Sequence, residues 1–138
     1  MQQGRGPWST LAVLAYIGSL VLPAVSFHSG AVSGIFCVLL GWLDFVPWSA
    51  NLALLTAAIL RAHGKPRAAL AGSLLAIALG LTTLRHVVHG DLDLGVGFYF
   101  WIGSMLAVAI GSSVSIVDRE LIARARARER VQRPTVAA

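Results

Sequence analysis

The sequence predicts an all-α polytopic membrane protein with four transmembrane helices, a short re-entrant or interfacial helix, and both termini in the cytoplasm. Three observations lead to this fold class. Long apolar stretches fill most of the 138 residues. The chain is 57% hydrophobic and only 12% charged, against about 25% charged in a typical soluble domain. Basic residues also cluster on alternate sides of the stretches. A soluble chain of this size could not bury so much apolar surface, because small domains have little interior.

Four stretches are the expected spans: Trp8–Phe27, Val46–Ile59 (with approximate bounds), Ala68–Leu84 and Gly97–Val117. Each is long enough, or nearly so, to cross a hydrocarbon core about 30 Å thick at about 1.5 Å per helical residue. The first stretch exceeds the roughly 7–15 apolar residues of a signal peptide, so we expect it to be a retained anchor.

The basic residues predict the orientation, because Lys and Arg collect in the cytoplasmic loops of membrane proteins. If both termini are cytoplasmic, all of the 11 basic side chains except Arg85 fall on the inner side. The apolar run Ala31–Leu43 must then not cross, since a crossing would move the polar turn at 61–67 and the basic tail outside. We therefore expect this run to dip into the outer leaflet and return.

Polar and aromatic residues near the ends of the spans have expected roles. Tryptophan rings favour the membrane–water interface, and the four expected there are Trp8, Trp42, Trp48 and Trp101. Asp44 precedes the second span, where a carboxylate caps free backbone N–H groups; a proton or ion ligand is the alternative. Asn51 is expected to hydrogen-bond a neighbouring helix, because an unpaired amide in hydrocarbon is costly.

The third and fourth expected spans each carry small residues four positions apart. These positions are Gly72, Ala76 and Gly80, and then Gly103, Ala107 and Gly111. Such spacing lines one helix face with small side chains and allows close approach of two backbones. Because a short turn joins the two spans, we expect them to be antiparallel neighbours with these grooves facing each other. The alternative is that Gly and Ala are simply common in membrane helices.

After Val117 the chain becomes polar, and we divide it into a transmembrane bundle at 1–117 and a basic cytoplasmic helical tail at 118–138. Strong helix formers fill Asp118–Val131, and an ion pair between Glu120 and Arg124 is expected one turn apart. Four arginines are expected to contact a partner or anionic lipid: Arg124, Arg126, Arg128 and Arg130. The simpler interpretation is a solvated determinant of orientation.

Few residues are of the types that perform chemistry. The weak candidates for a metal site are His86, His89 and Asp91, since imidazole and carboxylate bind zinc or copper. Cys37, the single cysteine, is interpreted as a small apolar side chain. The chain has no phosphate-binding loop and no nucleophile elbow, and its spans lack the mid-depth His that haem ligation needs. We expect no enzyme activity and no bound metal or cofactor.

Four motifs resemble a family of small uncharacterised bacterial inner-membrane proteins. They are Val21-Leu22-Pro23-Ala24, Gly41-Trp42-Leu43, Trp48-Ser49-Ala50-Asn51 and Gly95-Val96-Gly97-Phe98-Tyr99-Phe100-Trp101. The resemblance covers roughly residues 10–112. It departs from the family at Leu52, where the family has proline after the asparagine. The resemblance implies a four-helix inner-membrane fold, and it implies no activity.

Two classes of function remain. The favoured one is a non-catalytic accessory or stabilising subunit of a larger bacterial membrane complex, with respiratory and photosynthetic complexes as candidates. The alternative is an independent small transporter, channel or metal-handling protein. The expected partners are membrane lipids and other membrane protein subunits. Nucleic acid is not expected, because no aromatic residue is interleaved with the basic residues after Trp101. The expected location is the bacterial inner membrane, as a multi-pass protein.

Overall fold

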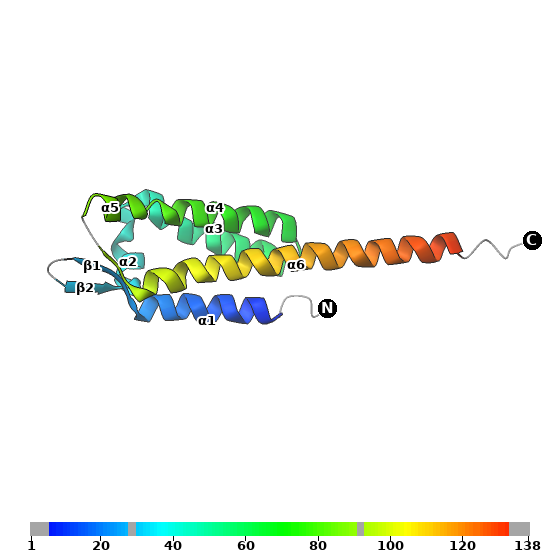
Figure 1. Cartoon of the computed structure of the whole chain (residues 1–138), viewed down its shortest axis with the longest axis horizontal. Helices are drawn as coiled ribbons and strands as arrows, with labels where there is room; N and C mark the ends of the chain where they lie inside the picture. The colour runs from blue at the N-terminus through cyan, green and yellow to red at the C-terminus, as the bar shows by residue number, and fades with distance from the viewer. Residues whose placement is uncertain (1–5, 28–29, 91–92, 133–138) are drawn as a thin grey trace, which may run out of the picture.

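The computed structural model describes residues 6–27, 30–90 and 93–132, and helices dominate this part of the chain. Four long helices lie side by side (Figure 1). They are α1 (Pro7–Val21), α3 (Phe45–Ala62), α4 (Pro66–Leu81) and α6 (Val96–Gln132). The predominantly helical fold predicted from the sequence is therefore confirmed.

The two ends of this bundle differ (Figure 1). At one, which we call the sheet end, lie β1 (Pro23–Phe27), β2 (Gly30–Ser33), α2 (Gly34–Leu40), the 3-10 helix η1 (Gly41–Leu43), α5 (Leu84–Val88) and β3 (Asp93–Leu94). At the other, which we call the basic end, lie the start of α1, the α3–α4 turn and the point where α6 leaves the bundle. The two basic segments, the turn and the helical tail, are thus at the same end, as the orientation argument requires.

Three helical segments of the described chain are long and apolar enough to cross a membrane. They are Phe45–Ala62, Pro66–Val88 and Val96–Glu129, and they contain the second, third and fourth expected spans. Transmembrane helices are thus supported. Two further apolar helices, Pro7–Val21 and Gly34–Leu43, are shorter, so a fourth crossing is not shown by helix length.

The first expected span, Trp8–Phe27, requires correction. Helix α1 ends at Val21 after 15 residues, and the chain continues as a strand from Pro23. Proline disfavours the α-helical region for the residue before it and has no N–H to donate. Leu22 accordingly has an extended backbone, with φ −76° and ψ 154°. The helical part of this segment is therefore only about 22 Å long.

A small antiparallel sheet, which the sequence analysis did not anticipate, follows α1. Its strand order is β2-β1-β3, with Val25 of β1 opposite Val32 and Leu94. The expected single helix at Ala31–Leu43 is therefore partly a strand. Helix α2 itself has 7 residues, about 10 Å, which is too short to cross a membrane.

Small residues form much of the core, and large apolar side chains cover the outside. The buried cluster contains Ala50, Ala57, Ala76, Met105 and Ala107. Exposed large side chains include Leu14, Ile17, Leu39, Leu55 and Leu75. This distribution suits a lipid solvent, where small residues allow close helix packing and apolar surface carries no penalty.

The predicted glycine positions pack differently from expectation. A Cβ at Gly72 would lie 3.1 Å from Ala57 Cβ on α3, whereas one at Gly80 would lie 3.1 Å from Ile102 Cδ1 on α6. At Gly111 a Cβ would overlap the guanidinium of Arg61, and at Gly103 it would meet no described atom within 4 Å. The two triplets therefore do not form one shared groove, although Ala76 and Ala107 are both buried in the core.

These contacts predict opposite outcomes for two Gly→Leu variants. Gly72→Leu should destabilise the bundle by about 1–3 kcal/mol, because α3 and α4 must separate to admit the side chain. Gly103→Leu should change the unfolding free energy by less than about 0.5 kcal/mol. Detergent-based unfolding followed by tryptophan fluorescence measures both. Equal destabilisation would contradict the packing of α4 on α3.

Candidate functional site

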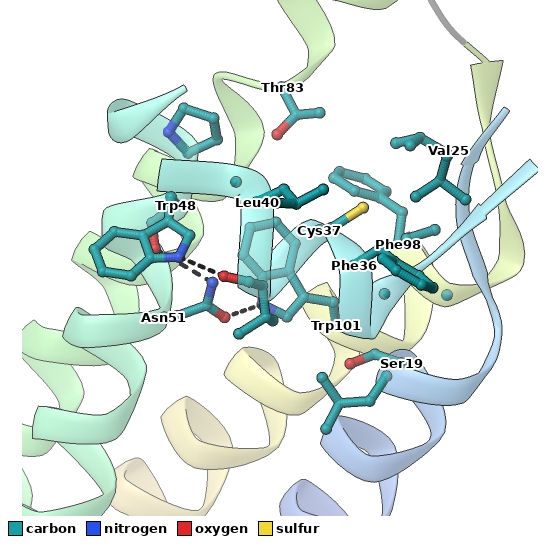
Figure 2. A pocket seen from close by; sticks show the side chains of 18 of the residues that line it. Ser19, Val25, Phe36, Cys37, Leu40, Trp48, Asn51, Thr83, Phe98 and Trp101 are labelled. Atoms are coloured by element: carbon teal, nitrogen blue, oxygen red, sulfur yellow. Dashed lines mark hydrogen bonds between the residues drawn. The ribbon is translucent and has the colours of Figure 1, made fainter. Parts of the chain in front are cut away.

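A cavity of about 390 Å³ opens at the sheet end, between α1, β1, β2, α2 and the first turns of α3 and α6. Its volume lies within the roughly 300–1,000 Å³ of small-molecule sites. Most of its wall is apolar, with Leu20, Val25, Val38 and Leu40 beside the rings of Phe36 and Phe98. Figure 2 shows Cys37 and Phe98 around this space, with Asn51 and Trp101 at its base.

Two close contacts between backbone segments, each at a glycine, position the walls of the cavity. Gly34 begins α2, and its N–H donates to the carbonyl of Leu22 at 3.1 Å. A Cβ on Gly34 would overlap the carbonyl oxygen of Ser19. At the other wall, a Cβ on Gly95 would overlap the carbonyl of Pro23. Only glycine lets the start of α2 and the start of α6 approach the α1–β1 segment so closely.

Asn51 joins three helices beneath the cavity. Its Oδ1 accepts hydrogen bonds from Trp101 Nε1 of α6 at 2.9 Å and from Tyr16 OH of α1 at 3.3 Å. Its Nδ2 donates to the carbonyl of Trp48, one turn earlier on α3, at 3.3 Å. The expected hydrogen bond to a neighbouring helix is confirmed. An amide placed here satisfies donors that hydrocarbon could not.

Trp48 fixes the short helix α2 above the bundle. Its indole Nε1 donates to the carbonyl of Val38 at 2.9 Å, and its ring lines the cavity. This bond satisfies one of the carbonyls that α2 leaves without a helical partner at its C-terminal end. The wall formed by α2 is therefore attached to α3 by a directional contact.

Asp44 lies at the rim of the cavity and forms an ion-pair cluster with α5. Its Oδ1 accepts from Arg85 Nη2 at 2.7 Å, and its Oδ2 lies 2.8 Å from His86 Nε2. The side chain makes no capping bond to α3, so the prediction of a capping carboxylate is wrong. The physical reason is competition: a nearby guanidinium offers a stronger, charged partner than a neutral backbone N–H.

The candidate metal ligands do not form a metal site in the described chain. His86 contacts Asp44, whereas the ring of His89 bonds the backbone carbonyl of Arg85. Asp91 lies outside the described residues. Among residues 6–27, 30–90 and 93–132, no group of three or more His, Cys, Asp or Glu side chains is arranged to hold a metal ion.

Cys37 faces the cavity from α2 (Figure 2). Burial raises the pKa of its thiol, so the side chain is protonated at neutral pH. A protonated thiol is a poor nucleophile and a poor metal ligand. The structure thus gives Cys37 the character of a small apolar wall residue.

The four tryptophans have different surroundings. Trp48 and Trp101 donate hydrogen bonds within the bundle near the sheet end. Trp42 in η1 is 58% exposed. Trp8 is half-buried at the start of α1, at the basic end. All four lie near helix ends, and two of them also contribute to the cavity.

The basic end is held together by contacts between the α3–α4 turn and α6. Arg119 Nη1 donates to the carbonyl of Gly64 at 2.8 Å. Glu120 pairs with Arg67 at 3.2 Å and not with Arg124, so the expected pair along the tail is wrong. Glu120 of α6 therefore turns its carboxylate toward Arg67 at the start of α4, and not toward Arg124 one turn later on its own helix.

Helix α6 has 37 residues and continues well beyond the bundle as a single helix (Figure 1). We call its part from Asp118 to Gln132 the tail helix. Arg124, Arg126 and Arg128 are exposed on it and have no hydrogen-bond or ion-pair partner within the described chain. Arg130 lies in the same helix, but its side chain is outside the described part.

Sequence reasoning missed the pairing of Asp44 with Arg85 and the contact of Arg61 with α6. Arg61 Nη1 lies 3.5 Å from the carbonyl of Val108, over the backbone that Gly111 leaves bare. One signal was present: Arg85 is the single basic residue on the expected outer side, and Asp44 directly follows the run that is expected to dip into the outer leaflet.

Comparisons with protein-family models, curated proteins and solved structures each find no match to this chain.

The hydrogen bonds of Asn51 predict a specific loss on substitution. Asn51→Leu keeps the size of the side chain but leaves Trp101 Nε1 and Tyr16 OH without their acceptor. The free energy of unfolding should fall by about 1–2 kcal/mol. Thr56→Val, which removes only an exposed bond to Leu52 within α3, should cost less than about 0.5 kcal/mol. If unfolding in detergent shows no difference between the two variants, Asn51 does not join the helices.

Proposed function

We propose that this chain is a non-catalytic accessory or stabilising subunit of a larger bacterial membrane protein complex, and that the tail helix docks on a partner subunit. The bundle lies in the inner membrane with four crossings. Both termini and the basic end face the cytoplasm, and the sheet end faces outward. Respiratory and photosynthetic complexes are candidates because they carry small helical subunits of this kind.

The single observation that carries this proposal is the tail helix itself. It extends past the other helices (Figure 1), and its arginines at 124, 126 and 128 have no partner in the described chain. Isolated helices of about 12–15 residues are marginal in water. Continuation from the apolar part of α6 provides the nucleus, and docking on an acidic partner surface would provide the remaining stabilisation.

The distribution of basic residues supports the proposed orientation. Arg85 is the basic residue at the sheet end, and Asp44 neutralises it at 2.7 Å. At the basic end, Arg67 is paired with Glu120, but the arginines of the tail helix carry uncompensated positive charge. Lys and Arg side chains therefore concentrate at one end, which is the arrangement of a cytoplasmic face.

The motifs that resemble the small bacterial inner-membrane family converge at the sheet end. Residues from all four motifs border the cavity: Ala24, Gly41, Trp48 with Asn51, and Gly97 with Phe98 and Trp101. Membership of this family is part of the proposal. The convergence supports this membership, because motifs that are distant in sequence would then all form the wall of one cavity.

A second candidate function rests on the cavity. Asn51 Nδ2 donates one hydrogen bond, and its other N–H has no acceptor within the described chain. An uncharged apolar molecule with one carbonyl group would fill the cavity against its aromatic wall, and the carbonyl oxygen would accept a hydrogen bond from that N–H. This favours an independent protein that binds or carries such a molecule. Gentle purification distinguishes the candidates: stoichiometric protein partners support the subunit, and a retained small molecule identified by mass spectrometry supports the carrier.

The docking proposal predicts that shape matters as well as charge in the tail. Replacing Arg124, Arg126, Arg128 and Arg130 together by Lys keeps every positive charge but removes the planar, bidentate guanidinium groups. Co-purification of the partner should fall by about tenfold or more, while the amount of chain in the membrane stays unchanged. Quantitative mass spectrometry of the tagged chain measures both.

A chain that ends at Val117 serves as the second variant. It should insert normally and lose the partner completely. Undiminished co-purification of either variant would show that the tail helix is only a solvated determinant of orientation.

A further inference from the structure

A second hollow, of about 500 Å³, lies at the basic end between the α3–α4 turn, the first turn of α4 and α6. We call it the basic cleft. Lys65, Arg67 and Arg119 line it, with Glu120 as its single acidic residue. Its remaining lining includes Pro66 and Ile116, which are apolar. Three cations therefore face one carboxylate around an open space.

Two of these cations have fixed positions: a backbone carbonyl holds Arg119, and the carboxylate of Glu120 holds Arg67. Arg119 Nη1 donates to the carbonyl of Gly64 at 2.8 Å, and the positive φ of Gly64, +70°, lets the turn present that carbonyl. Arg67 Nη2 donates to Glu120 Oε1 at 3.2 Å. Each guanidinium has five N–H donors, so both keep several that point to no group in the described chain.

The start of α4 adds to the positive potential of the cleft. Lys65 occupies the N-cap position without a side-chain capping bond, Pro66 is the first helical residue, and the first turn has no acidic side chain. The free N–H groups of a helix start carry a partial positive charge. A capping side chain such as Ser, Thr, Asp or Asn, which helices prefer at this position, would occupy some of these N–H groups.

The cleft also straddles the boundary between apolar and polar surface. Ile116 and Ala123 are its apolar residues on α6. Ile116 lies one turn before Glu120, and the last residue of the expected fourth span, Val117, follows it. In the proposed orientation this boundary is the cytoplasmic surface of the membrane. A ligand in the cleft would thus have its charged part among the cations and its apolar part beside Ile116.

We propose that the basic cleft binds the phosphate of an anionic phospholipid from the cytoplasmic leaflet. The phosphate accepts hydrogen bonds from Lys65, Arg67 and Arg119, and an acyl chain lies along α6. Basic pockets between helices on the cytoplasmic side suit anionic headgroups, and each Lys or Arg near the surface strengthens the attraction. The inference rests on the proposed membrane orientation but not on the proposed partner.

The test uses the purified full chain in neutral detergent, stripped of lipid, with native mass spectrometry as the readout. Phosphatidylglycerol is titrated against phosphatidylcholine with the same acyl chains. The unaltered chain should retain phosphatidylglycerol preferentially. The triple variant Lys65→Gln, Arg67→Gln, Arg119→Gln should bind it at least about tenfold more weakly.

The matched control carries Arg124→Gln, Arg126→Gln and Arg128→Gln, which remove the same charge outside the cleft. Its affinity for phosphatidylglycerol should change less than about twofold. Equal losses in both triple variants, or equal retention of the two lipids by the unaltered chain, would overturn the proposal. Because no partner is present, these outcomes are independent of the co-purification experiment.

A single charge reversal tests the proposal even if the triple variant fails to fold. Lys65 is exposed and makes no hydrogen bond through its side chain within the described residues, and a carboxylate is favourable at a helix start, so Lys65→Glu should not lower the thermal stability. It should still weaken phosphatidylglycerol binding by several-fold, since it replaces attraction to phosphate by repulsion. Unchanged binding in this variant would remove Lys65 from the site and contradict the three-cation arrangement.

Discussion

In hydrocarbon every backbone N–H and C=O group must be paired within the protein, and this constraint separates the molecule into two kinds of structure. Its middle consists of helices, whose backbone groups pair internally. Its sheet end contains a three-stranded sheet with open edges at β2 and β3 and helices as short as α5, whose end groups need water or side chains. The proposed orientation meets this need, because it places the sheet end at or beyond a membrane surface.

The polar side chains follow the same constraint. Asn51, inside the bundle, gives its oxygen to two donors from other helices. Asp44 and Arg85 neutralise each other at the sheet end. At the basic end, charges are left exposed on the tail helix. Together these contacts make the two faces of the bundle chemically different, with an apolar cavity near one and a basic cleft at the other.

Much of this arrangement could be predicted from the sequence. The length of an apolar stretch indicates a helix that can span a membrane, and the clusters of basic residues indicate which segments lie at the same end of the bundle. The helical tail was predictable from its strong helix formers, and the role of Asn51 from the cost of an unpaired amide in hydrocarbon. The failures occurred where tertiary contacts override local pattern. Pro23 ends α1 early and starts a sheet in which β1 pairs both with the adjacent strand β2 and with the distant strand β3. Asp44 pairs with Arg85 instead of capping α3, and the side chain of Arg61 on α3 packs over the backbone at Gly111. The cavity depends on close approaches at Gly34 and Gly95, which no local pattern reveals.

The most direct test of the account is the side of the membrane on which each end lies. In a Cys37→Ala background, Val88→Cys places a thiol at the sheet end, where Val88 is 84% exposed. His63→Cys places one in the exposed α3–α4 turn at the basic end. A membrane-impermeant maleimide applied to intact cells should label the first variant and not the second, and permeabilised cells should show both labelled. Labelling of His63→Cys in intact cells would contradict the orientation on which the proposed function and the lipid site both depend.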